Sequence, residues 1–128
     1  MLSEADGAFL DERGVAYEMI SEGQMFSLII SGFALPEGYE PAVVDLLLRL
    51  PATFSDAAPD MWWTSPAVAY TGGGVPPATE VREEHHDRTW QRWSRHLATA
   101  WRPGIDNLQS YLRLIRTDLE RGVPAVAA

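Results

Sequence analysis

The sequence of 128 residues contains no cysteine and no lysine. The absence of cysteine excludes disulfides, thiolate metal sites and a cysteine nucleophile. Any covalent chemistry must therefore use oxygen or nitrogen. Because lysine is also missing, all ten basic residues are arginines, and the chain offers no ε-amino group to a pathway that modifies lysines.

The sequence also lacks an apolar run long enough to span a bilayer and a basic, apolar N-terminal segment. These absences predict no transmembrane helix, no signal peptide and no membrane partner. The missing cysteines allow a cytoplasmic location, which we therefore expect. With 46% hydrophobic residues, the chain is expected to fold as one domain over residues 1–122, followed by a frayed tail at 123–128.

Positive charge is scarce and unevenly placed. The formal net charge is −8, and residues 1–60 hold eleven acids against two arginines. This balance argues against nucleic acid as the main partner. Residues 88–102 nevertheless contain Arg88, Arg92, Arg95 and Arg102 with no acid among them. Such a local excess of guanidinium groups predicts a site for a small anionic surface or a carboxylate.

Tryptophan is concentrated in the same stretch, where residues 90–96 read WQRWSRH and residues 101–104 read WRPG. Indole and guanidinium side chains are the usual anchors of protein interfaces. The alternative is that the indole rings plug this segment into the core while the arginines stay solvated. The interface interpretation predicts a partner-binding set of Trp90, Arg92, Trp93, Arg95, Trp101 and Arg102.

The order of predicted elements is helix, strands, long loop, helix. Ser3 is a typical N-cap for a helix over residues 3–13, and Gly14 ends it. Strand-forming residues then predict strands at 15–20, 25–31, 43–50 and 61–64. In the third of these strands, alternate residues from Val44 to Leu50 are predicted to face the core and Leu47 to face away from it.

Residues 71–104 lose all periodicity and are predicted to form one long loop with at most a turn of helix. Asp106 is then expected to cap a helix that ends at Arg121. The apolar side chains of this helix recur at helical spacing and predict one buried stripe, made of Leu108, Tyr111, Leu112, Ile115 and Leu119. These elements together indicate an α+β fold with an antiparallel sheet.

Two segments resemble motifs of the ubiquitin-conjugating superfamily. Residues 50–63, LPATFSDAAPDMWW, resemble its proline-rich turn that leads into an apolar strand, and Trp101-Arg102-Pro103 resembles its Trp-Ser-Pro motif. Residues 35–39, 58–61 and 90–96 are similar, more specifically, to a bacterial branch called prokaryotic family E. The resemblance covers nearly the whole chain.

This resemblance implies the ubiquitin-conjugating fold: an N-terminal helix, a four-stranded antiparallel meander, a long active-site loop and a C-terminal helix. It also implies partners, namely a ubiquitin-like protein, an adenylating activating enzyme and a JAB-type metallopeptidase. The departures from the family pattern are at the active site. The position of the family's catalytic cysteine is occupied by Trp93, and residues 83–87, EEHHD, replace the usual His-Pro-Asn motif. A thioester is therefore impossible.

Ser94 adjoins the missing cysteine, and His96 follows two residues later. A serine nucleophile needs a base within hydrogen-bond reach, so we predict Ser94 and His96 as a candidate catalytic pair. Three functions stay open. The chain could carry or position a ubiquitin-like protein, through an oxyester on Ser94 if it is an active transferase. It could instead be an inactive scaffold of the same fold, or a small anion-binding domain.

Neither a metal nor a cofactor is expected. His85 and His86 lie among the acids Glu83, Glu84 and Asp87, but adjacent histidines point apart on a strand and rarely share one ion. The glycine run at 72–74 lacks the Lys-Ser/Thr of a phosphate-binding loop and precedes proline, so it predicts a flexible turn.

Overall fold

The computed structural model describes residues 2–97 and 100–123. It has two helices and eight strands in this part of the chain, and neither helix is long and apolar enough to cross a membrane. The elements are α1 (Glu4–Glu12), β1 (Tyr17–Glu22), β2 (Met25–Ala34), β3 (Tyr39–Glu40), β4 (Val43–Pro51), β5 (Trp62–Ser65), β6 (Ala69–Tyr70), β7 (Arg82–His85), β8 (Arg88–Trp93) and α2 (Leu108–Gly122).

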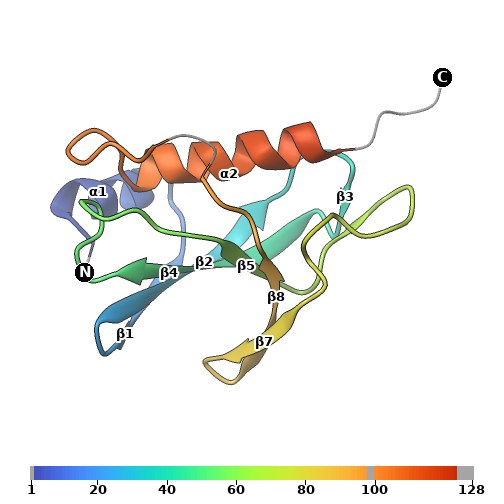
Figure 1. Cartoon of the computed structure of the whole chain (residues 1–128), viewed down its shortest axis with the longest axis horizontal. Helices are drawn as coiled ribbons and strands as arrows, with labels where there is room; N and C mark the ends of the chain where they lie inside the picture. Colours follow the sequence, from blue (N-terminus) through green and yellow to red (C-terminus); the bar gives the residue numbers. More distant parts are fainter. Residues whose placement is uncertain (1, 98–99, 124–128) are drawn as a thin grey trace.

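The main sheet is antiparallel and six-stranded, in the order β1-β2-β4-β5-β8-β7. Its first four strands are the four strands predicted from the sequence, and they follow one another along the chain as a meander. The structure adds a hairpin, β7 and β8, to the β5 edge (Figure 1). A separate two-stranded ribbon pairs β3 with β6. The α+β class is confirmed, and the four strands predicted as a meander form part of a larger, six-stranded sheet.

The hairpin also corrects the prediction of one long loop over residues 71–104. Only His86 and Asp87 separate the two strands, and both adopt left-handed backbone angles, with φ of 55° and 61°. Left-handed angles at both central residues are those of the two-residue turn that suits the twist of a hairpin. Asn or Gly normally marks such a turn, so the His-Asp pair gave no sequence signal for it.

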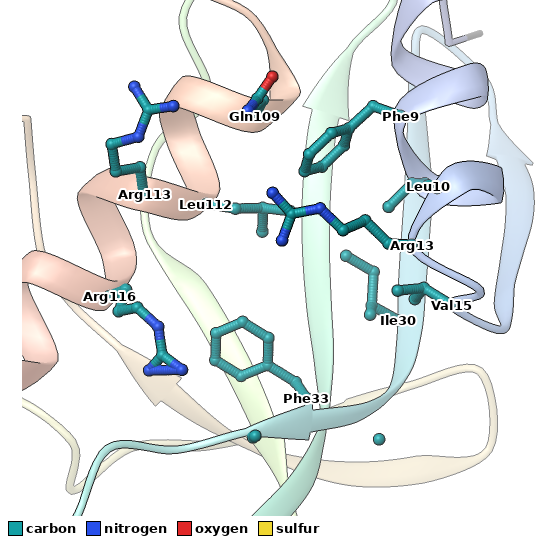
Figure 2. A pocket seen from close by; sticks show the side chains of 12 residues that line it. Phe9, Leu10, Arg13, Val15, Ile30, Phe33, Gln109, Leu112, Arg113 and Arg116 are labelled. Carbon is teal, nitrogen blue, oxygen red and sulfur yellow. The ribbon is translucent and has the colours of Figure 1, made fainter.

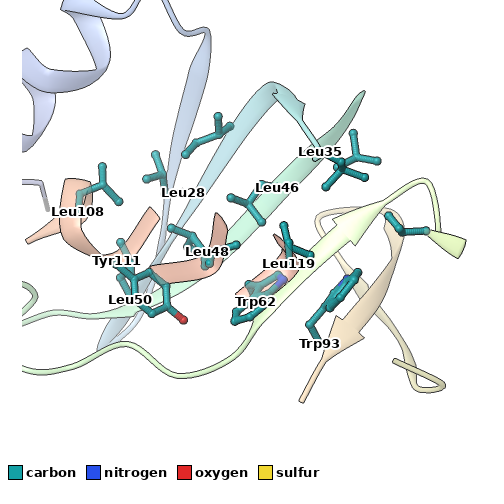
Figure 3. Close-up of a cluster of buried hydrophobic side chains, with 14 of the residues drawn as sticks. Leu28, Leu35, Leu46, Leu48, Leu50, Trp62, Trp93, Leu108, Tyr111 and Leu119 are labelled. Carbon is teal, nitrogen blue, oxygen red and sulfur yellow. The ribbon is translucent and has the colours of Figure 1, made fainter. Parts of the chain in front are cut away.

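Helix α2 lies across one face of the sheet, with α1 beside its N-terminal end (Figure 1). Side chains from alternate positions of β2 and β4 meet α2 in the main core, together with Trp62 and Trp93 (Figure 3). The helix buries four of the five residues in the predicted stripe: Leu108, Tyr111, Ile115 and Leu119. The fifth, Leu112, is only half-buried because it lies at the edge of the core, towards α1.

Both ends of α2 are fixed by side chains from distant parts of the chain. At its N-terminus, Asn107 is the cap and the Leu108 amide donates to the carboxylate of Asp6 in α1. At its C-terminus, the Tyr39 hydroxyl donates to the Leu119 carbonyl at 2.6 Å, and burial raises the pKa of Tyr39 to about 12. These bonds satisfy groups that a helix leaves unpaired at its ends.

The prediction of Asp106 as the N-cap is wrong by one residue. Asp106 instead accepts hydrogen bonds from the backbone and guanidinium of Arg102, four residues earlier. Asn107 and Ser110 form a reciprocal capping box in its place. Such a box satisfies two amides at once, which explains why the helix begins after Asn107.

The opposite face of the sheet holds a second, smaller core of Ile29, Leu47, Trp63 and Trp90. The sheet curls over this face and brings its two edge strands, β1 and β7, towards each other. His86 in the β7–β8 turn contacts Glu22 at the far end of β1, with 2.6 Å between nitrogen and oxygen. Leu47 is therefore fully buried, although the sequence pattern predicted that it faces away from the core. The four-residue cluster is called the second core below.

Two carboxylates at the border of the second core are held ionised. The Ser27 hydroxyl donates to Glu22 at 2.6 Å and keeps the pKa of that carboxyl below its ordinary value of 4.5. For Glu83, burial alone would raise the pKa. Hydrogen bonds from His85, Trp63 and Arg92 outweigh this effect and lower it.

We expect acid to weaken the fold through these two carboxylates. Because both folded-state pKa values are lowered, the stability that they contribute is full above about pH 4.5, the unfolded value, and is lost as pH falls through the folded values. Urea unfolding between neutral pH and pH 3 should show this loss. The double variant Glu22→Gln/Glu83→Gln should flatten the acid slope, whereas Glu84→Gln, an exposed neighbour in β7, should leave it in place. An unchanged slope in the double variant would assign the acid sensitivity to other groups.

Candidate functional site

The segment that follows β8 is held between two strained loop positions. The Ser94 amide donates to the Ala78 carbonyl at 2.9 Å, and the Met61 amide donates to the Arg95 carbonyl at 3.2 Å. Ala78 and Met61 both adopt left-handed backbone angles, with φ of 62° and 61°. Side chains other than Gly, Asn and Asp rarely adopt this conformation, and such strain concentrates at functional sites. Residues 94–96 and their contacts are therefore the candidate site.

Ser94 is half-buried and its hydroxyl has one defined partner among the described residues. The Nε of Arg92 donates to the Ser94 Oγ at 3.0 Å, while the Nη1 of the same guanidinium donates to Glu83 at 2.8 Å. Ser94 acts only as an acceptor in this contact. Its own proton is not used in this contact, and the charge of the guanidinium beside the oxygen is itself paired with Glu83.

His96 does not pair with Ser94, contrary to the predicted catalytic pair. Its Nδ1 contacts the Asp60 carboxylate at 2.8 Å, and the His96 side chain is 71% exposed. Asp60 had no predicted role, although it lies in the family-like segment 58–61. An imidazole oriented by a carboxylate is a common acid–base arrangement. Here, however, the imidazole contacts Asp60, and the serine that it was expected to activate is contacted by Arg92 instead.

The three tryptophans of the predicted interface lie in different surroundings. Trp90 and Trp93 are completely buried, the former in the second core and the latter under α2. The expectation that these two rings frame a partner site is wrong, because a buried ring has no surface to offer. Trp101 is half-buried. Its Nε1 donates to the Ser55 carbonyl at 2.9 Å, and its ring packs on Phe54 and Tyr111.

The four arginines that were predicted to form a positive site are all paired. Three of the four partners come from other elements. The segment 88–102 therefore contains no acid in its sequence but contacts acids in the fold. Arg102 remains the most accessible, with 64% of its side chain exposed. The local positive charge is largely neutralised, which removes the basis of the small-anion alternative. The pairs are Arg88 with Asp45, Arg92 with Glu83, Arg95 with Asp118 and Arg102 with Asp106.

The histidines that suggested a metal are drawn to different carboxylates. His85 contacts Glu83 at 3.0 Å, whereas His86 contacts Glu22 at 2.6 Å on the other side of the curled sheet. Across residues 2–97 and 100–123, no three His, Asp or Glu side chains gather where they could hold an ion.

A groove of about 480 Å³ lies between α2 and residues 97, 100–102 and 106. Leu97, Trp101 and Leu114 supply apolar walls, and Arg102 and Arg113 supply positive charge. The groove begins at Leu97, the residue after His96 of the candidate site, and extends past Trp101. It combines an apolar lining with guanidinium groups, which suits an extended chain end that carries a carboxylate.

Comparison with known proteins agrees with the motifs read from the sequence. A sequence model of the family described as Prokaryotic E2 family E matches residues 2–122. This match covers both helices and the whole sheet, and it supports a role related to ubiquitin conjugation. No curated protein and no solved structure matches the chain.

Proposed function

Because the chain belongs to prokaryotic E2 family E, we propose that it positions a ubiquitin-like protein for conjugation without forming a thioester. The observation that carries this proposal is the environment of Ser94. This residue adjoins the position of the family's cysteine, and its hydroxyl is anchored by Arg92 rather than by a base. His96 is engaged with Asp60. The site is therefore better suited to holding a partner than to activating a nucleophile.

The groove beside Trp101 is the surface proposed to receive the partner's C-terminal end. Arg102 is exposed at this groove, and its only carboxylate contact among the described residues is Asp106, four residues along the chain. Surface pairs of this kind contribute little stability. A guanidinium that is paired so weakly can exchange Asp106 for a partner's carboxylate at small cost. Trp101 would provide the apolar contact next to it.

A second candidate, an oxyester carrier, is favoured by the contact between Arg92 and Ser94. The Ser94 Oγ would attack the activated C-terminal carbonyl of the ubiquitin-like protein. A carbon–oxygen bond would form, the activating group would leave, and the hydroxyl proton would pass to solvent. The Arg92 guanidinium would stabilise the negative charge that develops on Oγ.

An adduct assay separates the two candidates. The protein is incubated with a ubiquitin-like protein, its activating enzyme and ATP, and partner binding is measured in parallel by calorimetry. For the positioning function we expect a complex without a covalent adduct, and weaker binding by at least about tenfold for Arg102→Glu, since a charge-assisted bond is replaced by repulsion. Thermal melting checks that this exposed substitution leaves the fold intact.

The carrier function predicts a different result, an adduct that survives reducing agent but is cleaved by hydroxylamine. Ser94→Ala would abolish this adduct and Thr89→Ala, an exposed hydroxyl in β8, would not. His96→Ala would leave it nearly unchanged if the imidazole stays with Asp60. Thr99, the other nearby hydroxyl in the sequence, lies outside the described residues. Absence of both complex and adduct would overturn the proposed function.

A further inference from the structure

A second groove lies on the flank of α2 that faces α1, and of its lining only Arg113 also borders the groove beside Trp101. This second groove has a volume of about 370 Å³ and runs between α1, Val15 ahead of β1, the bulged part of β2 and α2. Phe9, Phe33 and Leu112 are half-buried along it, with Leu10 and Ile30 beneath them (Figure 2). It is called the α1–α2 groove below.

Three arginines border the α1–α2 groove. Arg13 extends from the end of α1 across the groove towards α2, and Arg113 and Arg116 project from α2 (Figure 2). All three are exposed. No acidic residue lines the groove, and within residues 2–97 and 100–123 no carboxylate lies within 4.0 Å of these guanidinium groups.

This charge arrangement is unusual for the molecule. Among the described residues, five of the ten arginines are in ion pairs, and three of the other five meet at this one groove. The chain as a whole carries a net charge of −8. Three uncompensated cations over an apolar floor therefore form the best place on the described surface for an anionic group that also brings apolar surface.

We propose that the α1–α2 groove binds an acidic peptide segment of a protein partner, with an aromatic or leucine side chain inserted over Phe9, Phe33 and Leu112. The guanidinium groups lie on both sides of the groove, Arg13 on α1 and the other two about one helical turn apart on α2. Several carboxylates along a chain can engage all of them, whereas one carboxylate cannot. An anionic membrane or a nucleic acid would also face the surface outside the groove, where the net charge of −8 repels it, whereas a short acidic peptide contacts the groove alone.

The direct test is a titration, by fluorescence anisotropy, with a labelled peptide of alternating Asp-Glu pairs and single Phe or Leu residues. We expect the protein to bind this peptide, and raised salt to weaken the binding because the contacts are charged. The variant Arg13→Ala/Arg113→Ala/Arg116→Ala should lose at least about tenfold in affinity. Arg121→Ala is the matched control. It removes an exposed arginine of α2 that has no ion pair within the described residues and does not line the groove, so its affinity should equal that of the wild type.

A second peptide and a second variant test the apolar part of the proposal. The same peptide with Asn and Gln in place of Asp and Glu should bind poorly. Leu112→Asp, which places a negative charge on the half-buried floor, should abolish binding of the acidic peptide. Thermal melting and circular dichroism report whether each variant is folded, and the triple arginine variant carries the test if Leu112→Asp is not.

Three outcomes would overturn the proposal. The first is no binding of the acidic peptide at low salt, and the second is equal affinity of the wild type and the triple variant for it. The third is binding of laurate, a fatty acid with one carboxylate, below its micelle concentration when the peptide does not bind. This experiment needs no ubiquitin-like protein, so its failure is distinguishable from failure of the positioning function. Loss of partner binding in Arg102→Glu with intact peptide binding would support two separate surfaces.

Discussion

Replacing Trp90 by Ala is expected to lower the free energy of unfolding by about 3–5 kcal/mol, as truncation of a buried tryptophan does. The Trp90 ring is completely buried in the second core against Trp63 and Leu47. Its Nε1 donates to the His85 carbonyl at 3.0 Å, and the Arg88 guanidinium lies 4.5 Å above the ring centre. The substitution removes all of these contacts and leaves a cavity between β8 and the rest of the sheet.

Urea unfolding measures this loss, and Trp101→Ala provides the comparison. Trp101 is half-buried in a loop, so its truncation should cost less, about 1–3 kcal/mol. If Trp90 formed part of a partner-binding surface, as the sequence suggested, Trp90→Ala would weaken partner binding and change the free energy of unfolding little. A loss below about 1 kcal/mol for Trp90→Ala would place the ring at the surface and contradict the second core.

Periodicity predicted α2 and β4, whose apolar residues recur at regular intervals, whereas α1 was predicted from its N-cap and Gly14 and the other three strands from their strand-forming residues. Helix α1 and the strands β2 and β4 begin within a residue of where the pattern places them. The hairpin of β7 and β8 was missed because its apolar content is low and its turn residues are His86 and Asp87. Charged side chains are tolerated there because they pair with acids and bases of other strands at the border of the second core.

The spacing of Trp90 and Trp93 indicates a sheet covered on both faces, but this was missed because residues 71–104 were predicted to form a loop. Residues three apart in a strand point to opposite faces of the sheet. Trp90 accordingly lies in the second core and Trp93 in the main core under α2. Two large rings on opposite faces of one strand indicate a sheet that is covered on both sides. That inference requires knowing first that the segment is a strand.

The contacts of the candidate site could not be read from sequence because most join distant residues. His96 and Asp60 are separated by 36 positions, and Arg95 pairs with Asp118 across the segment between β8 and α2. The fold determines these pairings, so a local count of charges overstated the positive potential of residues 88–102. The contacts of Arg102 with Asp106, at a separation of four, and of Arg92 with Ser94, at a separation of two, lie within the range of a local pattern.

The side chain of Gln91 is expected to be the most important buried polar group in the sheet. It is 1% exposed, accepts from the Val68 amide at 2.7 Å and donates to the Val68 carbonyl at 3.0 Å. It also accepts from the Thr64 hydroxyl at 3.0 Å, and the Thr64 oxygen in turn accepts from the Trp93 Nε1 at 2.9 Å. This network ties the connection after β5 to β8.

Gln91→Leu should therefore cost about 2–5 kcal/mol, although Leu nearly matches Gln in volume. The substitution leaves both backbone groups of Val68 buried without a partner, and each such group costs about 1–3 kcal/mol. Urea unfolding gives the total, and hydrogen exchange at the Val68 amide shows whether the loss is local. A loss of less than about 0.5 kcal/mol would mean that water or a rearranged loop satisfies Val68.

Thr64→Val completes a double-mutant cycle with Gln91→Leu. Because the two side chains share one hydrogen bond, the cost of the double variant should differ from the sum of the single costs by about 0.5–3 kcal/mol. Additive costs would show that the two residues act independently. Coupling matters for the candidate site, because the β5–β8 pairing sets Thr64 opposite Gln91 and Trp62 opposite Trp93. The same pairing places Arg95 beside Met61, and with it Ser94 and His96 at the end of β8. A weakened network should thus loosen the contact of His96 with Asp60, which the NMR chemical shifts of the His96 ring would report.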